Sequence, residues 1–291
     1  MAFAETWARA FRRIPKREPR MRPKTAIAIG AIILVAFSVT IGAWLYPHDP
    51  NVQVLEDRYL GPSLDHPFGT DRLGRDLLAR VLAGGRVSLL ASVLSVILAL
   101  LGGTALGLLA GYLRGAIDGI FSRLFDALQV IPGLVLLIAL AGVLGRDFTS
   151  VILGLGILYS IKIFRVTRAV TASIRTEVYV DASVAMGGSR AHVMGRHILA
   201  GALSPLLVQA TILVGWGVVA ETGLSYLGLG VQPPNASLGS ILAEGTVSMT
   251  QSPWLIIFPG LFIAVVTLSL FTLSDALRGA LGRPIGGTGE A

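Results

Sequence analysis

The residue types that most often carry chemistry are sparse in this chain, and their spacing forms no catalytic pattern. There is no cysteine, which excludes disulfides, thiolate metal sites and cysteine nucleophiles. The four histidines are scattered, and His192 and His197 lie five positions apart, a poor spacing for two ligands on one α-helical face. We therefore expect neither a metal site nor a bound cofactor.

Motifs for nucleotide or ester hydrolysis are missing as well. Without a G-x-x-x-x-G-K-[ST] segment, the chain cannot bind ATP through a phosphate-binding loop. The patterns H-E-x-x-H and G-x-S-x-G are also absent. We therefore expect that the chain is not an enzyme, and a membrane-embedded enzyme is the weaker alternative.

Three ionisable residues fall within or beside long apolar segments: Asp126, Lys162 and Glu221. A charge at membrane depth is costly and by default indicates function. Two interpretations of Glu221 remain open: it lines a translocation path or stabilises a bend, or it is hydrogen-bonded between helices for packing. Asp126 and Lys162 are expected nearer the membrane surface, where snorkelling or local ion pairing would stabilise them.

These charges belong to a chain that is too apolar for a water-soluble core. Hydrophobic residues make up 53% of its 291 residues and charged residues only 14%. Several apolar segments reach about 18 residues or more, the length that predicts membrane helices. We therefore predict an all-α membrane protein with six spans. The spans are expected at 25–46, 87–112, 120–143, 150–170, 202–229 and 253–276.

Small residues and proline predict local geometry in two spans. Gly102, Gly103 and Gly107 allow another helix to approach the second span closely. Pro132 removes one backbone donor from the third span and predicts a kink. Before the second span, residues 71–82 carry leucine and valine at helical spacing, which predicts an amphipathic helix at the membrane interface.

The distribution of basic residues predicts the orientation. The net charge is +7, and a cytoplasmic N-terminus leaves most basic residues inside, as the positive-inside rule requires. Both termini of this multi-pass cell-membrane protein are then cytoplasmic. The same distribution argues against nucleic-acid binding. The expected regions are a basic arm 1–24, a first span with an extracytoplasmic segment 25–85, a transmembrane core 86–278 and a cytoplasmic tail 279–291.

The largest predicted cytoplasmic loop spans residues 171–201 and contains the polar stretch Glu177–Leu199. This stretch is longer than a connection between two spans requires, and small residues fill its middle. A short helix presented to a groove is a common mode of protein recognition. We therefore predict a docking surface for another protein.

Helix signals divide this loop into two short helices. Residues 174–186 favour the first helix, which Gly187 and Gly188 should end because glycine adopts positive φ values. Ser189 is suited to cap the second helix, which we predict over residues 190–199. The expected shape is helix, tight turn, helix.

The loop resembles that of the permease subunits of ABC importers, which carries the pattern Glu-Ala-Ala, three residues, Gly, then Ile-x-Leu-Pro. Asp181-Ala182-Ser183, three residues and Gly187 match its first half, and His197-Ile198-Leu199-Ala200 matches its end. Asp181, Ser183 and Ala200 depart from the family residues Glu, Ala and Pro.

Other segments resemble the C-type permeases of dipeptide, oligopeptide and nickel importers. The resemblance covers essentially residues 25–283. The matching segments are His66–Asp76 with Arg86–Leu89, Ala220–Pro234, Pro253-Trp254 and Phe258-Pro259-Gly260.

The resemblance implies a type I ABC importer permease fold with a cytoplasmic coupling helix. It implies a homologous permease as partner in a heterodimer, two ATP-binding subunits, an extracytoplasmic solute-binding protein and the lipid bilayer. The ATPase-coupling residues would be Asp181, Ala182, Ser183, Met186, Gly187, Gly188 and His197. We further expect Glu221, Pro132 and Asp126 along the translocation path or its gate.

The expected substrate is a peptide, either an oligopeptide or a dipeptide. Nickel chelates, glutathione and other small solutes remain alternatives for the same machinery. A secondary transporter is a remote alternative, because it should carry paired intramembrane charges or inverted repeats with broken helices.

Overall fold

Residues 23–281 are described in the computed structural model, and they contain helices and no β-strand. The prediction of an all-α protein is confirmed. Most of the arm 1–24 and of the tail 279–291 lies outside the described residues. The α-helices are α2 (Pro23–Phe37), α3 (Ala43–Leu45), α4 (Leu77–Leu113), α5 (Gly115–Val130), α6 (Gly133–Leu144), α7 (Phe148–Ile174), α8 (Val178–Ala185), α9 (Arg190–His192), α10 (Leu199–Tyr226), α11 (Leu238–Val247) and α12 (Trp254–Leu281). The π-helical segments are η1 (Ser38–Gly42) and η3 (Val193–Ile198), and η2 (Leu55–Asp57) is a 3₁₀ turn.

Five continuous helices are long and apolar enough to cross a bilayer. They are Pro23–Leu45, Leu77–Leu113, Phe148–Ile174, Arg190–Tyr226 and Trp254–Leu281. The pair α5 and α6 brings the number to six if it counts as one bent span. The predicted six-span architecture therefore holds, with a broken third span.

The third span is interrupted rather than kinked. The axes of α5 and α6 differ by 98°. The break has a local cause, because Pro132 has no N–H and disfavours the α-conformation of the residue before it. Ile131 is accordingly extended, at φ −73° and ψ 126°. The predicted single kinked helix over 120–143 is corrected to two helices.

The predicted interfacial helix over residues 71–82 is wrong. Residues 71–76 form a turn, and α4 begins at Leu77 with the Asp76 carboxylate accepting a hydrogen bond from the Ala79 N–H at 2.7 Å. Leu77 and Val81 are buried in a cluster with residues of α11 and α12. The leucine-rich face therefore packs against protein rather than lipid.

The most extensive helix packing joins α4 to α7. A methyl group added at Gly103, Gly107 or Gly111 would lie 2.6 to 2.7 Å from the nearest atom of α7. Glycines four residues apart form a groove that lets two helix backbones meet. The prediction is confirmed for Gly103 and Gly107. It is wrong for Gly102, which meets nothing within 4 Å in the described chain, and the sequence analysis missed Gly111.

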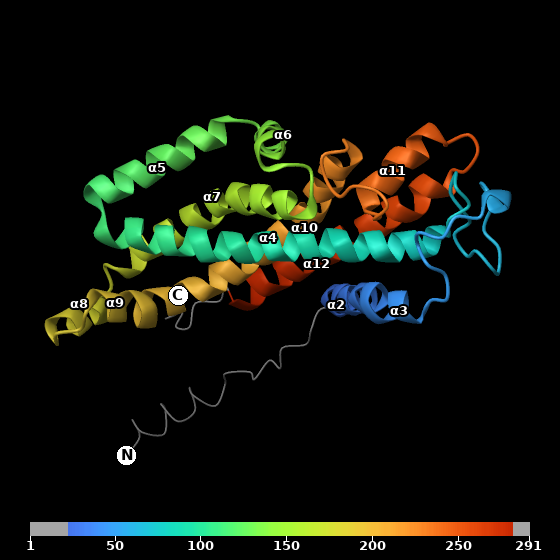
Figure 1. Ribbon diagram of the computed structural model, residues 1–291. Helices are drawn as coiled ribbons and strands as arrows, with labels where there is room; N and C mark the ends of the chain where they lie inside the picture. Colours follow the sequence, from blue (N-terminus) through green and yellow to red (C-terminus); the bar gives the residue numbers. More distant parts are fainter. Residues whose placement is uncertain (1–22, 282–291) are drawn as a thin grey trace, which may run out of the picture.

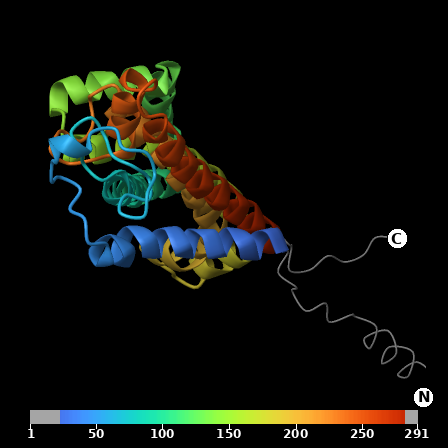
Figure 2. The ribbon, with the colours of Figure 1, turned by 90° about the vertical axis from the view of Figure 1, so that its right-hand side faces the viewer.

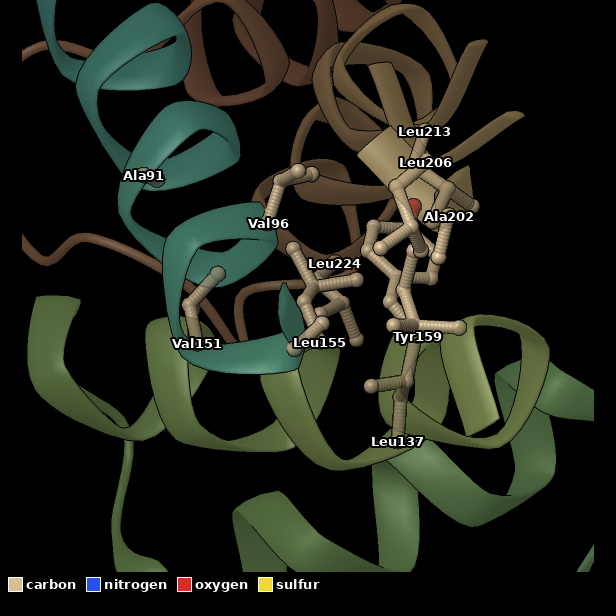
Figure 3. Packing of buried hydrophobic residues seen from close by; sticks show 12 residues of the cluster. Ala91, Val96, Leu137, Val151, Leu155, Tyr159, Ala202, Leu206, Leu213 and Leu224 are labelled. Carbon is tan, nitrogen blue, oxygen red and sulfur yellow. The ribbon is translucent and has the colours of Figure 1, made fainter. Parts of the chain in front are cut away.

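The largest apolar cluster lies where α4, α6, α7 and α10 meet, as Figure 3 shows. Its side chains come from all four helices, so the cluster fixes their mutual positions. The labelled residues are Ala91, Val96, Leu137, Val151, Leu155, Tyr159, Ala202, Leu206, Leu213 and Leu224.

Two polar regions lie at opposite ends of α4 (Figure 1). Helices α8 and α9 lie beside its C-terminal end, and the segment 47–76 covers its N-terminal end. Helix α2 runs along the edge of the bundle, where it contacts α12 (Figure 2). This arrangement separates the two candidate interaction regions by the length of a membrane span.

Candidate coupling loop and charged helix face

The polar loop after α7 forms a short helix and a glycine turn. α7 ends at Ile174, and three residues separate it from α8, so the predicted start of that helix at residue 174 is corrected to Val178. Gly187 has φ +85°, which confirms the predicted positive-φ turn. The Gly188 N–H donates to the Ser183 carbonyl oxygen at 2.9 Å.

The next helical turn begins with a serine cap, as predicted. The Ser189 Oγ accepts a hydrogen bond from the His192 N–H at 3.2 Å. The second helix, however, does not end near residue 199. Helix α9, the π-helical segment η3 and α10 form one continuous helix, Arg190–Tyr226. The helix continues through Ala200, where the family pattern has proline.

The turn presents apolar side chains to solvent. Met186 is 83% exposed and Val178 is 82% exposed. Asp181 and Ala182 are exposed too, whereas Ser183 is buried under the turn. Exposed apolar groups on a polar segment mark protein interaction sites. The geometry therefore suits docking into a groove.

The loop is fixed to the transmembrane helices by its own apolar cluster. Val180, Val193 and Ile198 are buried there against Leu108 and Tyr112 of α4. The guanidinium carbon of Arg175 lies 5.5 Å from the centre of the Tyr112 ring, within the range of a cation–π contact. A displacement of the loop would therefore act on both α4 and α10.

The π-helical segment changes the relation between two histidines. The rings of His192 and His197 are 5.8 Å apart, and the His197 ring lies 5.9 Å from that of Tyr179 on α8. The expectation that five-residue spacing separates these histidines is wrong here, because a π-helix pairs residues i and i+5. Within residues 23–281, no group of three or more His, Asp or Glu side chains could hold a metal.

Glu221 is completely buried between two helices. Its carboxylate accepts hydrogen bonds from Ser225 of α10 at 2.6 Å and from Ser88 of α4. The geometry corresponds to the second of the two interpretations, an interhelical hydrogen bond. The sequence analysis did not identify Ser88, which lies 133 positions away and has no pattern that indicates its partner.

Charged side chains join α5 to α7. Asp126 and Arg165 form an ion pair at 2.6 Å, which confirms the predicted local pairing of Asp126. Asp118 pairs with Arg168, whose Nη2 lies 2.8 Å from the carboxylate. Both pairs are partly exposed, with Asp126 at 64% and Arg165 at 44%. Lys162 is exposed and forms no ion pair within the described part of the chain.

At the opposite end, an ionic network that the sequence analysis missed holds α11 against the start of α4. Arg75 lies 2.6 Å from Asp71 and 3.0 Å from Glu244 of α11. Arg80 is buried beside the same two carboxylates, at 3.3 and 3.7 Å. The sequence signal for this network is the cluster of two acidic and two basic residues within 71–76.

Asp76, which follows Arg75 of this network, contacts two further side chains. The Tyr46 hydroxyl donates to the Asp76 carboxylate at 3.1 Å, and the His66 ring nitrogen lies 2.8 Å from the same oxygen. Asp76 therefore joins the end of the first span to the start of α4.

Comparison with known proteins adds an independent line of evidence. Residues 103–286 match the family described as binding-protein-dependent transport system inner membrane component. A putative peptide transport system permease of Brucella suis is 35% identical over 264 residues, covering 90% of this chain and 89% of the relative.

Two further relatives have similar coverage. A probable D,D-dipeptide transport system permease of Escherichia coli is 36% identical, over 91% of this chain and 89% of the relative. A glutathione transport system permease of Pectobacterium atrosepticum is 36% identical, over 90% and 87%.

Proposed function

We infer the role of this chain from one premise: it belongs to the family of binding-protein-dependent transport system inner membrane components, the permease subunits of ABC importers. It is a multi-pass membrane protein and a permease subunit of such an importer. On this basis we propose that it forms half of a translocation pore for peptides, paired with a homologous permease. Two ATP-binding subunits and an extracytoplasmic solute-binding protein complete the proposed assembly.

The peptide substrate is supported by the relatives, two of which are named for peptides or D,D-dipeptides. Glutathione is the second candidate, because another relative is named for glutathione transport. Uptake of a radiolabelled dipeptide and of radiolabelled glutathione into proteoliposomes, each with the cognate binding protein and ATP, separates them. Uptake of neither solute would contradict both assignments, and uptake without ATP would favour a secondary transporter.

The observation that carries the coupling role is the exposed turn at the end of a continuous helix. We propose that α8 and the following turn dock in a groove of an ATP-binding subunit through Asp181, Ala182, Met186, Gly187, Gly188 and His197, with the buried Ser183 supporting the turn from beneath. The helix Arg190–Tyr226 has 37 residues and is about 55 Å long, enough to cross the bilayer. Motion of the turn would therefore reach the far side through one continuous helix, which contains Pro205.

Docking drives transport only if the two states of the ATP-binding subunits bind the turn differently, since a ligand with equal affinity for two states shifts no equilibrium. The apolar cluster under the loop supports this coupling. Because Val180 and Val193 pack against α4, closing of the ATP-binding subunits would move α4 and α10 together.

The path is proposed to run along the side of α5 and α6. The helix break at Pro132 and the charge of Asp126 support this, because irregular backbone and charges inside a membrane require protein or water around them. Glu221 would act as a positioning residue that fixes α10 to α4 beside the path.

The proposed orientation has both termini in the cytoplasm, with α8 inside and α11 outside. A cysteine test addresses docking and orientation together, because the natural chain has no cysteine. Met186→Cys is expected to cross-link to an ATP-binding subunit in the assembled importer. Met249→Cys, at an exposed methionine after α11 that is 60% accessible, is the matched control.

Met249→Cys should instead react with a membrane-impermeant thiol reagent added outside intact cells. Absence of any Met186→Cys cross-link, in both ATP-bound and ATP-free complexes, would contradict the coupling proposal. External labelling of Met186→Cys would contradict the orientation.

A further inference from the structure

We propose that a charged strip on α7, consisting of Lys162 and Arg165 with Asp126 of α5, faces the water-filled path and that the Lys162 ammonium attracts the carboxylate of a passing solute. The inference rests on the proposed function, because it assigns the strip to the path of an importer. It names a chemical class of ligand, a carboxylate-bearing solute, and the side chain that receives it.

The strip lies at membrane depth. Helix α7 begins at Phe148, and Lys162 is fourteen residues further along, about 21 Å at 1.5 Å per residue. Arg165 follows at about 25 Å. With Phe148 at the outer boundary of a hydrocarbon core about 30 Å thick, both positions lie in its cytoplasmic third, on the side where the sequence places Lys162. A tilt of the helix would bring them closer to its middle.

The side chains at this depth are open on the surface of the isolated chain. Arg165 is 44% exposed and Asp126 is 64% exposed, although they form an ion pair. Ionised side chains inside a membrane almost always face a protein interior or a water-filled cavity, because contact with lipid costs about 2.5–3.5 kcal/mol at the helix centre. Lysine and arginine near a helix end can snorkel to the interface, but the short Asp126 side chain cannot, so the ion pair favours a water-filled or protein-lined surrounding.

The helix break beside Asp126 also requires hydrogen-bonding partners. Helix α5 ends at Val130, one turn after Asp126, so its last carbonyl groups have no helical N–H partners. Ile131 and Pro132 are both exposed at the break. Irregular backbone at membrane depth is tolerated where it lines a water-filled cavity or is covered by protein. The break and the strip thus adjoin at the C-terminal end of α5, and both favour a polar surrounding.

The charges of the strip do not balance. The carboxylate of Asp126 forms an ion pair with the Arg165 guanidinium at 2.6 Å. Lys162 lies three residues before Arg165, on the same face of the helix, and has no ionic partner among residues 23–281. The strip thus carries one excess positive charge. A carboxylate is the complementary group, and peptides carry one at the C-terminus.

Water access is tested with cysteine variants of the full importer, reconstituted in phosphatidylcholine vesicles so that anionic lipid cannot contribute. Lys162→Cys is compared with Leu268→Cys, which is 65% exposed and lies fourteen residues into α12, the same distance along its helix. With a hydrophilic methanethiosulfonate reagent on the cytoplasmic side, we expect Lys162→Cys to react at least about tenfold faster. Equal rates would overturn the path assignment and indicate a position covered by lipid or by the partner permease.

The preference for anions is tested at Ala169, an exposed residue two turns further along the same face. Ala169→Cys is labelled with an anionic and with a cationic methanethiosulfonate, with residue 162 as lysine, arginine or glutamine. At about 10 Å in water, loss of one charge should lower the ratio of anionic to cationic rates about fourfold in Lys162→Gln. Lys162→Arg should keep the ratio.

A ratio that is unchanged in Lys162→Gln would overturn the role of Lys162. These labelling rates report water and charge at the strip whether or not the loop docks on an ATP-binding subunit. Failure of this inference is therefore distinguishable from failure of the cross-link at Met186.

Discussion

The contact between α4 and α7 can be tested by adding one methyl group, in Gly107→Ala. The new carbon would lie 2.6 Å from the Thr167 Cβ and 2.8 Å from the Phe164 carbonyl oxygen. Ordinary contacts of this kind begin near 3.4 Å, so the helices must separate by nearly 1 Å. The Phe164 oxygen belongs to the backbone and cannot rotate away. The strain therefore falls on the whole helix pair.

Overpacking of this kind lowers the free energy of unfolding by about 1–3 kcal/mol. Separation of the helices also weakens the neighbouring dispersion contacts at Gly103 and Gly111. A loss of 1 kcal/mol in unfolding free energy lowers the melting temperature by roughly 2–4 °C. We therefore expect Gly107→Ala to lower the melting temperature of the purified importer by several degrees. The measurement is thermal unfolding in detergent, followed through the exposure of buried aromatic residues.

Gly102→Ala is the matched control, since an added carbon there meets nothing within 4 Å in the described chain. Both variants gain the same helix propensity from alanine, so their difference isolates the packing term. If the two variants melted at the same temperature, the close approach of α4 and α7 described here would be refuted.

Three further substitutions test other parts of the fold. Arg75 lies 3.0 Å from the Glu244 carboxylate, so Glu244→Gln leaves its buried charge partly uncompensated. We expect a loss of about 3–5 kcal/mol in unfolding free energy. An unchanged denaturation midpoint would contradict this. Ser189→Ala removes a helix cap and should cost about 1 kcal/mol locally, measured as faster hydrogen exchange in the loop alone. Gly187→Ala strains a backbone at φ +85° by about 1–2 kcal/mol and should lower ATP-dependent uptake. Gly195→Ala, where an added carbon meets nothing within 4 Å in the described chain, should leave uptake unchanged.

The sequence predicts the spans well because their signal is local. Length and hydropathy identify each apolar helix, and the turn at Gly187 follows from one residue's freedom of φ. Pro132 likewise marks the position of the break, but not its size. A proline removes one hydrogen bond in any helix, and the 98° angle depends on what packs against each half.

Features that depend on distant residues were not predictable. The burial of the first turn of α4 depends on α11 and α12, more than 150 positions later in the chain. Nothing in the sequence distinguishes the inward-facing Gly103 from its neighbour Gly102, because only the partner helix defines the side that packs. The roles of the coupling and path residues stay predictions until the experiments above are done.

The π-helical segment η3 fixes how far the turn at Met186 is rotated about the helix axis relative to α10. Successive residues of an α-helix are rotated by about 100° around the axis, and a π-helical turn accommodates one additional residue. Deleting Gly195 would restore an α-helical turn and rotate everything before it by about 100° relative to α10. Met186 would then point away from the direction in which it now projects. The π-helical segment therefore fixes the direction in which Met186 projects relative to α10.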